Sequence, residues 1–129
     1  MCKKNMFLIF VVLLLGIVGS ALAVDTDWTN GGGDRVWDNA ANWALGVPTS
    51  ADKAAIRNDL ILGPIIDSST TAVTNLVVLG DWSSYGDTLD ITGGSLSTNG
   101  WFIIGYSAGN NGTFIVSGGT TSVGENLFV

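Results

Sequence analysis

The chain has 129 residues, a formal net charge of −6, no histidine and a single cysteine at position 2. The absence of histidine excludes Ser-His-Asp and Cys-His catalysis and the common histidine-containing zinc sites. The excess of acidic residues disfavours nucleic acid and anionic membranes as partners, because both would be repelled.

Residues 1–23 have the pattern of a signal peptide. A short basic stretch precedes an apolar run from Met6 to Val18, and the small-x-small sequence Ala21-Leu22-Ala23 follows. An uncleaved membrane anchor is the alternative, because the run is almost long enough to span a bilayer. We expect cleavage after Ala23, which removes the only cysteine and leaves three basic and eleven acidic residues. The sequence therefore predicts a secreted or cell-surface protein without disulfides and outside the membrane.

Residues 24–57 form a tryptophan-rich segment that contains Trp28, Trp37 and Trp43. Large rings cover the open end of a β-structure with few residues, so we expect this segment to cap the first coil of the fold that follows. Exposed tryptophans that stack on sugar faces are the alternative. Asp52 is expected to begin a turn or strand, not to act as a catalytic acid.

Residues 58–129 carry a 25-residue repeat. The sequence from Thr88 to Ser95 recurs from Thr113 to Thr120, and Leu76–Gly80 recurs as Trp101–Gly105. Apolar residues alternate along each repeat, which predicts strands with one buried face. Corners are expected at Gly93-Gly94, Asn99-Gly100 and Gly105, where glycine permits positive φ angles.

These features predict an all-β fold, a right-handed parallel β-solenoid with 25-residue coils and an N-terminal tryptophan-rich cap. A β-sandwich has similar strand lengths but gives no reason for a fixed repeat. Because no polar cap precedes the last residue, Val129, we expect the solenoid to be incomplete at its C-terminal end. The predicted inward residues of the central repeat are Leu89, Ile91, Leu96, Thr98, Phe102 and Ile104, and those of the preceding repeat are Ile66, Thr71, Val73, Val77 and Leu79.

The spacing W…GxW…NW…GxP…DxAxI, followed by IxGGxL repeats, resembles the start of bacterial exported β-solenoid proteins. These are the autotransporter-associated β-strand-repeat proteins and PEP-CTERM-type surface proteins with pectin-lyase-like coils. The resemblance implies a surface, adhesive or polysaccharide-associated protein, and it implies architecture more than activity.

Candidate carbohydrate-binding residues are Trp82, Tyr85, Trp101 and Tyr106, which the repeat places near one edge of the solenoid. Outward positions of the third strand are also apolar where water is expected, namely Leu76, Val78, Trp101, Ile103 and Phe128. Such a face marks either an interaction surface or a surface covered by another part of a longer chain.

No catalytic residue and no metal site is predicted. Asp81, Asp87 and Asp90 gather near one corner but do not recur as a pair on one strand face, so we interpret them as solvated turn acids. Calcium binding by the loop from Asp81 to Asp87 is a weaker hypothesis, because the calcium-binding nonapeptide repeat is missing.

We therefore expect a non-enzymatic extracellular or cell-surface repeat protein that associates with polysaccharide and packs against further coils. Two alternatives from other classes remain. One is the leading segment of a secreted polysaccharide lyase or glycoside hydrolase whose active site lies beyond residue 129. The other is a carbohydrate-binding module built on the aromatic loops.

Overall fold

The computed structural model describes residues 22–57, 62–81 and 86–129, so most of the predicted leader lies outside the described residues. In this part of the chain the structure has nine β-strands and one short 3-10 helix. In chain order they are β1 (Asp25–Asp27), η1 (Ala40–Asn42), β2 (Lys53–Ile56), β3 (Ile65–Ile66), β4 (Thr71–Thr74), β5 (Leu76–Leu79), β6 (Asp87–Thr98), β7 (Phe102–Ile104), β8 (Gly112–Val123) and β9 (Leu127–Phe128).

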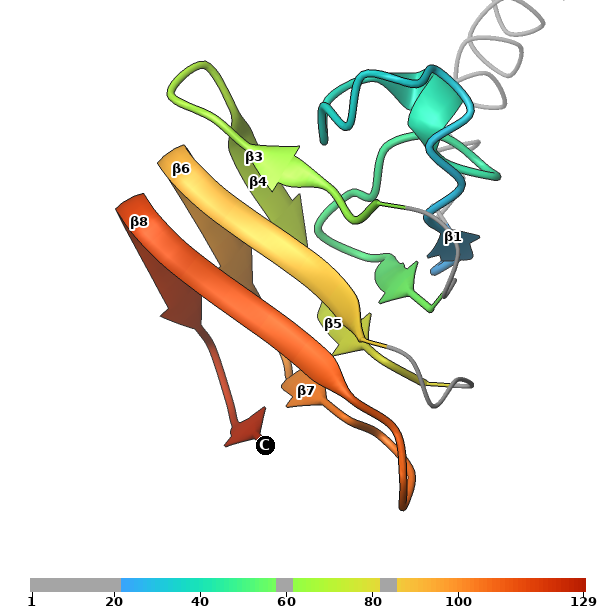
Figure 1. Ribbon diagram of the computed structural model, residues 1–129, viewed down its shortest axis with the longest axis vertical. Coiled ribbons are helices and arrows are strands. Elements are labelled where there is room, and N and C mark those ends of the chain that lie inside the picture. Colours follow the sequence, from blue (N-terminus) through green and yellow to red (C-terminus); the bar gives the residue numbers. More distant parts are fainter. Residues whose placement is uncertain (1–21, 58–61, 82–85) are drawn as a thin grey trace, which may run out of the picture.

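The strands form two parallel sheets that wind into a β-solenoid of about four turns (Figure 1). One sheet has the order β1-β2-β5-β7-β9. In the other, β6 pairs with β3 and β4 along one edge and with β8 along the other. All of these pairings are parallel, which confirms the predicted solenoid and excludes an antiparallel sandwich.

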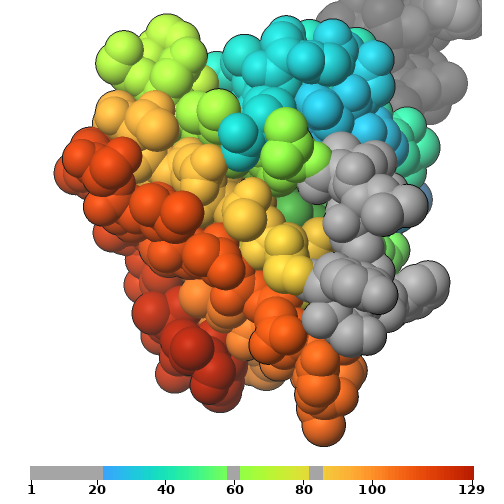
Figure 2. Space-filling view, viewed as in Figure 1, coloured from blue at the N-terminus to red at the C-terminus, as the bar shows by residue number. Residues whose placement is uncertain are grey.

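The coils succeed one another in sequence order along the molecule. In the space-filling view the colours pass from blue, over the N-terminal segment, to red, over the last coil (Figure 2). The 25-residue period sets the register in both sheets: Ile66 pairs with Ile91 and Ile91 with Val116, while Val77 pairs with Phe102 and Phe102 with Leu127. At these positions, successive coils therefore stack equivalent residues in one column.

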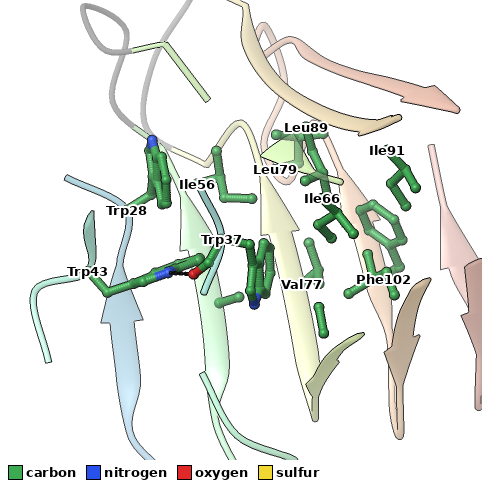
Figure 3. Close-up of a cluster of buried hydrophobic side chains, with 13 residues drawn as sticks. Trp28, Trp37, Trp43, Ile56, Ile66, Val77, Leu79, Leu89, Ile91 and Phe102 are labelled. Carbon is green, nitrogen blue, oxygen red and sulfur yellow. Dashed lines mark hydrogen bonds between the residues drawn. The ribbon is translucent and has the colours of Figure 1, made fainter. Parts of the chain in front are cut away.

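Inward side chains from both sheets fill one apolar core (Figure 3). Phe102 lies at the C-terminal side of this core, where its ring meets that of Phe114 edge to face at a centroid distance of 4.8 Å. The buried core residues are Trp28, Trp37, Trp43, Ala54, Ile56, Ile66, Ala72, Val77, Leu79, Leu89, Ile91, Leu96 and Phe102. The core thus runs without a break from the tryptophan-rich segment into the repeat.

The three tryptophans of the N-terminal segment are buried, as the capping interpretation predicts. Trp43 packs edge to face against both Trp28 and Trp37, with centroids 5.0 and 4.8 Å apart. Its indole Nε1 donates to the carbonyl of Trp37 at 2.7 Å (Figure 3). The indole of Trp28 donates to the carbonyl of Leu62 at 2.9 Å. These rings are therefore packing residues, and the alternative that they stack on sugar is wrong.

The inward assignment is wrong at β4. Ala72 and Thr74 are buried there, and they pair with Leu96 and Thr98, so the local offset is 24 residues and not 25. Thr71 and Val73, predicted to face inward, occupy the other face. The cause is one extra residue in the corner before β4, where the turn at Asp67 is longer than its counterpart after Ile91. The next corner is one residue shorter, so the register is restored at β5.

The glycine pairs have a different role from the one predicted. Gly93 and Gly94 lie inside the long bent strand β6, and neither has a positive φ. A Cβ atom on Gly94 would lie 2.1 Å from the carbonyl oxygen of Thr70, so the close approach of the previous coil excludes a side chain. Of the other predicted corners, Gly105 has a positive φ, as predicted, whereas Gly100 does not.

The interpretation of Asp81, Asp87 and Asp90 as solvated acids is wrong for all three. The Asp81 side chain is only 12% exposed and is paired with Arg57. Asp87 is buried, since it begins β6 on the same face as Leu89. Asp90 accepts from Arg35 Nη2 at 2.9 Å, and Arg35 Nε also donates to the carbonyl of Gly63 at 2.8 Å. This arginine therefore ties the tryptophan-rich segment to β6.

Candidate carbohydrate-binding surface

Trp101 lies on the outer face of the first sheet and is partly exposed. It immediately precedes β7, whose inward residue Phe102 is fully buried, so alternation turns the indole outward. Its side chain is 44% exposed, and its ring meets that of Phe128 edge to face at 5.6 Å. Phe128 of the adjacent coil therefore packs against the indole, which remains partly exposed.

An apolar hollow of about 280 Å³ lies on one side of this indole. Tyr106, which is 59% exposed, stands at its edge because Gly105, with φ +70°, turns the chain at the end of β7. The Tyr106 backbone N–H donates to the carbonyl of Gly80 at 3.0 Å, which fixes this turn on the preceding coil. The hollow is lined by Trp101, Ile103, Ile104, Gly105, Tyr106, Phe128 and Val129.

A smaller, more polar hollow of about 160 Å³ lies on the other side of Trp101. Asn75, Gly100 and Glu125 line it, and they occupy one column of the repeat, 25 residues apart. Backbone hydrogen bonds stack the three, from Gly100 N to Asn75 O at 2.8 Å and from Glu125 N to Gly100 O at 3.1 Å. Because Gly100 has no side chain, a gap remains between the amide and the carboxylate of its neighbours.

The arrangement therefore combines an apolar face with hydrogen-bonding groups. The indole offers a flat surface to the C–H face of a sugar ring, and Asn75 and Glu125 offer an amide and a carboxylate to hydroxyl groups. Neither hollow is lined by lysine or arginine, so the surface holds no cation for a sulfate or a carboxylate. Its chemistry fits an uncharged saccharide.

The structure brings two of the four predicted residues together. Trp101 and Tyr106 line the same hollow. Trp82 and Tyr85 lie outside the described residues, so their predicted place beside Tyr106 stays a prediction. Of the predicted outward apolar residues, Val78 and Ile103 are buried, with Ile103 lining the hollow, whereas Phe128 is exposed.

Two residues of the polar hollow, Asn75 and Glu125, were not predicted from the sequence. The signal was present, because the 25-residue offset aligns Asn75 with Gly100 and Gly100 with Glu125, immediately before the column that contains Trp101. Outward aromatic residues are conspicuous in a strand, whereas asparagine and glutamate are common on any surface, so this column gives only a weak signal.

The acids of the predicted calcium loop have other partners where they are described. Asp81 accepts from Arg57 Nη1 at 3.2 Å, and Arg57 Nε donates to Asp27 at 2.6 Å. The Asp27 carboxylate, which accepts this hydrogen bond, raises the pKa of Arg57 above its ordinary value. Burial opposes the shift, and Asp81 adds to it. Within residues 22–57, 62–81 and 86–129, no group of three or more acidic, histidine or cysteine residues is placed to hold a metal ion.

None of the helices in the described part of the chain is long and apolar enough to cross a membrane. No protein-family model matches the sequence, and no curated protein or solved structure shows significant similarity to the chain.

Proposed function

We propose that the chain is a non-enzymatic, exported structural or adhesive protein that associates with polysaccharide through the surface around Trp101. The family resemblance to autotransporter-associated and PEP-CTERM-type surface proteins belongs to this proposal, and so does a location outside the cell. The observation that carries it is the half-exposed indole of Trp101 between an apolar hollow and a hydrogen-bonding hollow.

The parallel sheet supports this function by holding the binding groups in place before any ligand arrives. Trp101 is braced by Phe128, and Tyr106 is held at its turn by a backbone hydrogen bond to Gly80. Little side-chain freedom is then lost on binding, which favours association with a flat and weakly interacting ligand. Because both hollows are shallow and uncharged except for Glu125, binding is expected to be weak and insensitive to salt.

The test is a titration of the chain against a panel of neutral and acidic polysaccharides. We expect a neutral glycan to bind, with Trp101→Ala weakening the binding by roughly tenfold, the loss expected from one aromatic stacking contact. Tyr106→Phe keeps the ring and should bind normally, whereas Tyr106→Ala should bind more weakly.

Leu45→Ala is the matched control, since Leu45 is exposed and lies in the N-terminal segment, away from both hollows. A folded chain that binds no member of the panel would refute the proposal. If the Trp101→Ala variant binds as well as the unchanged chain, the binding site lies elsewhere on the protein.

A further inference from the structure

We propose that Asp52 is the docking site for the α-amino group that signal-peptide cleavage creates at Val24, so that processing adds an ion pair to the first coil. Because it requires the cut between Ala23 and Val24, this site rests on the proposed export of the chain. It lies at the N-terminal end of the fold and does not depend on polysaccharide binding.

The chain joins the fold at Val24. Leu22 and Ala23 are exposed, Leu22 to 82%. The carbonyl of Val24 accepts from the backbone N–H of Lys53 at 2.9 Å, beside the parallel pairing of β1 with β2. The backbone N–H of Val24 donates to Asp52 Oδ1 at 2.9 Å. The predicted cut therefore falls immediately before the residue that these bonds hold.

The Asp52 carboxylate is oriented by the turn before β2. Its Oδ2 accepts from the backbone N–H of Thr49 at 2.9 Å and from the Thr49 hydroxyl at 2.6 Å, which leaves Oδ1 for Val24. The Asp52 carbonyl accepts from Asn75 N at 2.9 Å and from the Thr74 hydroxyl at 2.7 Å, so the next coil fixes its backbone. The Thr49 hydroxyl, followed by the backbone N–H of Val24, holds the pKa of Asp52 below its ordinary value of 3.8, although burial opposes the shift. An ionised carboxylate thus already faces the Val24 nitrogen.

Cleavage changes the nitrogen that Asp52 faces from an amide to an ammonium group. A host signal peptidase hydrolyses the bond between the carbonyl carbon of Ala23 and the nitrogen of Val24. Water supplies the hydroxyl of the new Ala23 carboxyl group, which ionises, and one hydrogen of the new amine, which takes up a proton at neutral pH. The hydrogen bond to Asp52 then becomes an ion pair, and such charge-assisted bonds are roughly twice as strong as those between neutral groups.

The neighbouring charged groups leave Asp52 to this ammonium group. The segments packed against β1 and β2, residues 39–51 and 71–79, contain no charged residue. Within the part of the chain that the structure describes, Asp52 has no lysine or arginine partner. The other charged groups on these two strands and directly after them pair with one another, Asp25 with Lys53 at 2.5 Å and Asp27 with Arg57 at 2.6 Å.

The experiment compares the melting temperatures of two purified chains, one that begins at Val24 and one that keeps Leu22 and Ala23. Every described strand lies between Asp25 and Phe128, so both chains carry the whole described fold. In the longer chain the Val24 nitrogen is an uncharged amide. Below neutral pH we expect the chain that begins at Val24 to melt higher by about 2–5 °C, the shift that a partly exposed ion pair gives in a domain of this size.

The pH dependence of this difference identifies the ammonium group. An opposite charge raises the pKa of an α-amino group, whose ordinary value is about 7.7–8.0. The added stability is therefore fully present below the ordinary value and is lost as the pH rises through the raised pKa of the folded state. The longer chain corrects for every other group that titrates in this range.

Asp52→Asn should abolish the difference between the two chains, because the charge that attracts the ammonium group is removed. Asp67→Asn is the matched control, since Asp67 holds a similar turn by accepting from the Ser69 backbone N–H at 2.9 Å and from its hydroxyl at 2.6 Å. This control should lower the melting temperature of both chains equally and leave their difference unchanged.

A titration of the unchanged chain that begins at Val24 keeps the test independent of how well the variants fold. Nuclear magnetic resonance of Val24 follows the α-amino group directly, and its pKa should be higher in the folded chain than in the same chain unfolded by urea. Equal pKa values, a melting difference that does not fall as the pH rises, or one that survives in Asp52→Asn would each overturn the proposal. An unprocessed chain in the host would contradict the proposed export, whereas these measurements on purified chains test the docking site alone.

Discussion

Replacing Phe102 by alanine should remove a large share of the stability of the fold. Phe102 is fully buried in β7, between Val77 and Leu127 of the same column, and its ring packs edge to face on Phe114. Emptying a buried phenylalanine site costs about 3–5 kcal/mol, which includes the cavity left behind. Because domains of this kind are typically stable by only about 5–15 kcal/mol, the variant should unfold at a much lower denaturant concentration.

Phe128 supplies the matched control, since the same substitution there removes the same atoms from the adjacent strand. Its side chain is 46% exposed and touches Trp101 on the outer face, so Phe128→Ala should cost about 1 kcal/mol or less. Urea unfolding followed by far-ultraviolet circular dichroism measures both values. Equal costs for the two variants would refute the division of these strands into an inner and an outer face, because a slip of one residue exchanges the two faces.

The four remaining predictions concern β4, the ion pair of Arg35 with Asp90, the carboxylate of Asp67 and the signal peptide. At β4, Ala72→Glu should abolish cooperative unfolding because Ala72 is buried, while Thr71→Glu should change the melting temperature little; the reverse result would restore the uniform 25-residue offset. Asp90→Ala should lower the free energy of unfolding by roughly 1 kcal/mol, since it removes the carboxylate that pairs with the partly buried Arg35, and a double-mutant cycle with Arg35→Ala measures the coupling. The side-chain hydroxyl and then the backbone N–H of Ser69 hold the pKa of Asp67 below its ordinary value of 3.8. The stabilisation that the ionised Asp67 carboxylate gives to the folded state is therefore present above pH 3.8 and is lost as the pH falls through its lower pKa in the folded state. In that pH range the melting temperature of Asp67→Ala should respond less to acid than that of the unchanged chain. Finally, the chain exported by a bacterial host should begin at Val24, and N-terminal sequencing that finds Met1 on membrane-bound protein would contradict the predicted signal peptide.

The repeat made most of the fold predictable because a parallel solenoid stacks equivalent residues on one another. The offset of 25 correctly places Ile91 on Ile66 and Phe102 on Val77. It fails at β4 because a solenoid tolerates different corner lengths, and a pattern of Thr, Ala, Val and Thr contains too little contrast between its two faces to reveal the shift. Asp87 also occupies an inward position, which the pattern did not predict because acidic residues are expected to lie in solvent.

The candidate binding surface was predictable only in part, for a related reason. Aromatic outward residues such as Trp101 stand out in a strand because water is expected there. The burial of Val78 was not predictable, since alternation assigns a face but does not say what covers it. Asn75 and Glu125 are common surface residues, and only their stacking around Gly100 gives them a shared position.

The long corner at Asp67 also has a consequence for how such a protein can change. The Asp67 carboxylate accepts from the backbone N–H of Ser69 at 2.9 Å, so the added residue is held by a local hydrogen bond. The carbonyls of Asp67 and Thr70 still receive the N–H groups of Gly94 and Ser95 from the next coil. This corner is one residue longer than its counterpart and the next corner is one residue shorter, and the backbone pairing of both sheets is kept. The fold therefore constrains the length of a whole turn more than the length of a single corner, so a residue inserted at one corner and removed at the next should leave the sheets intact.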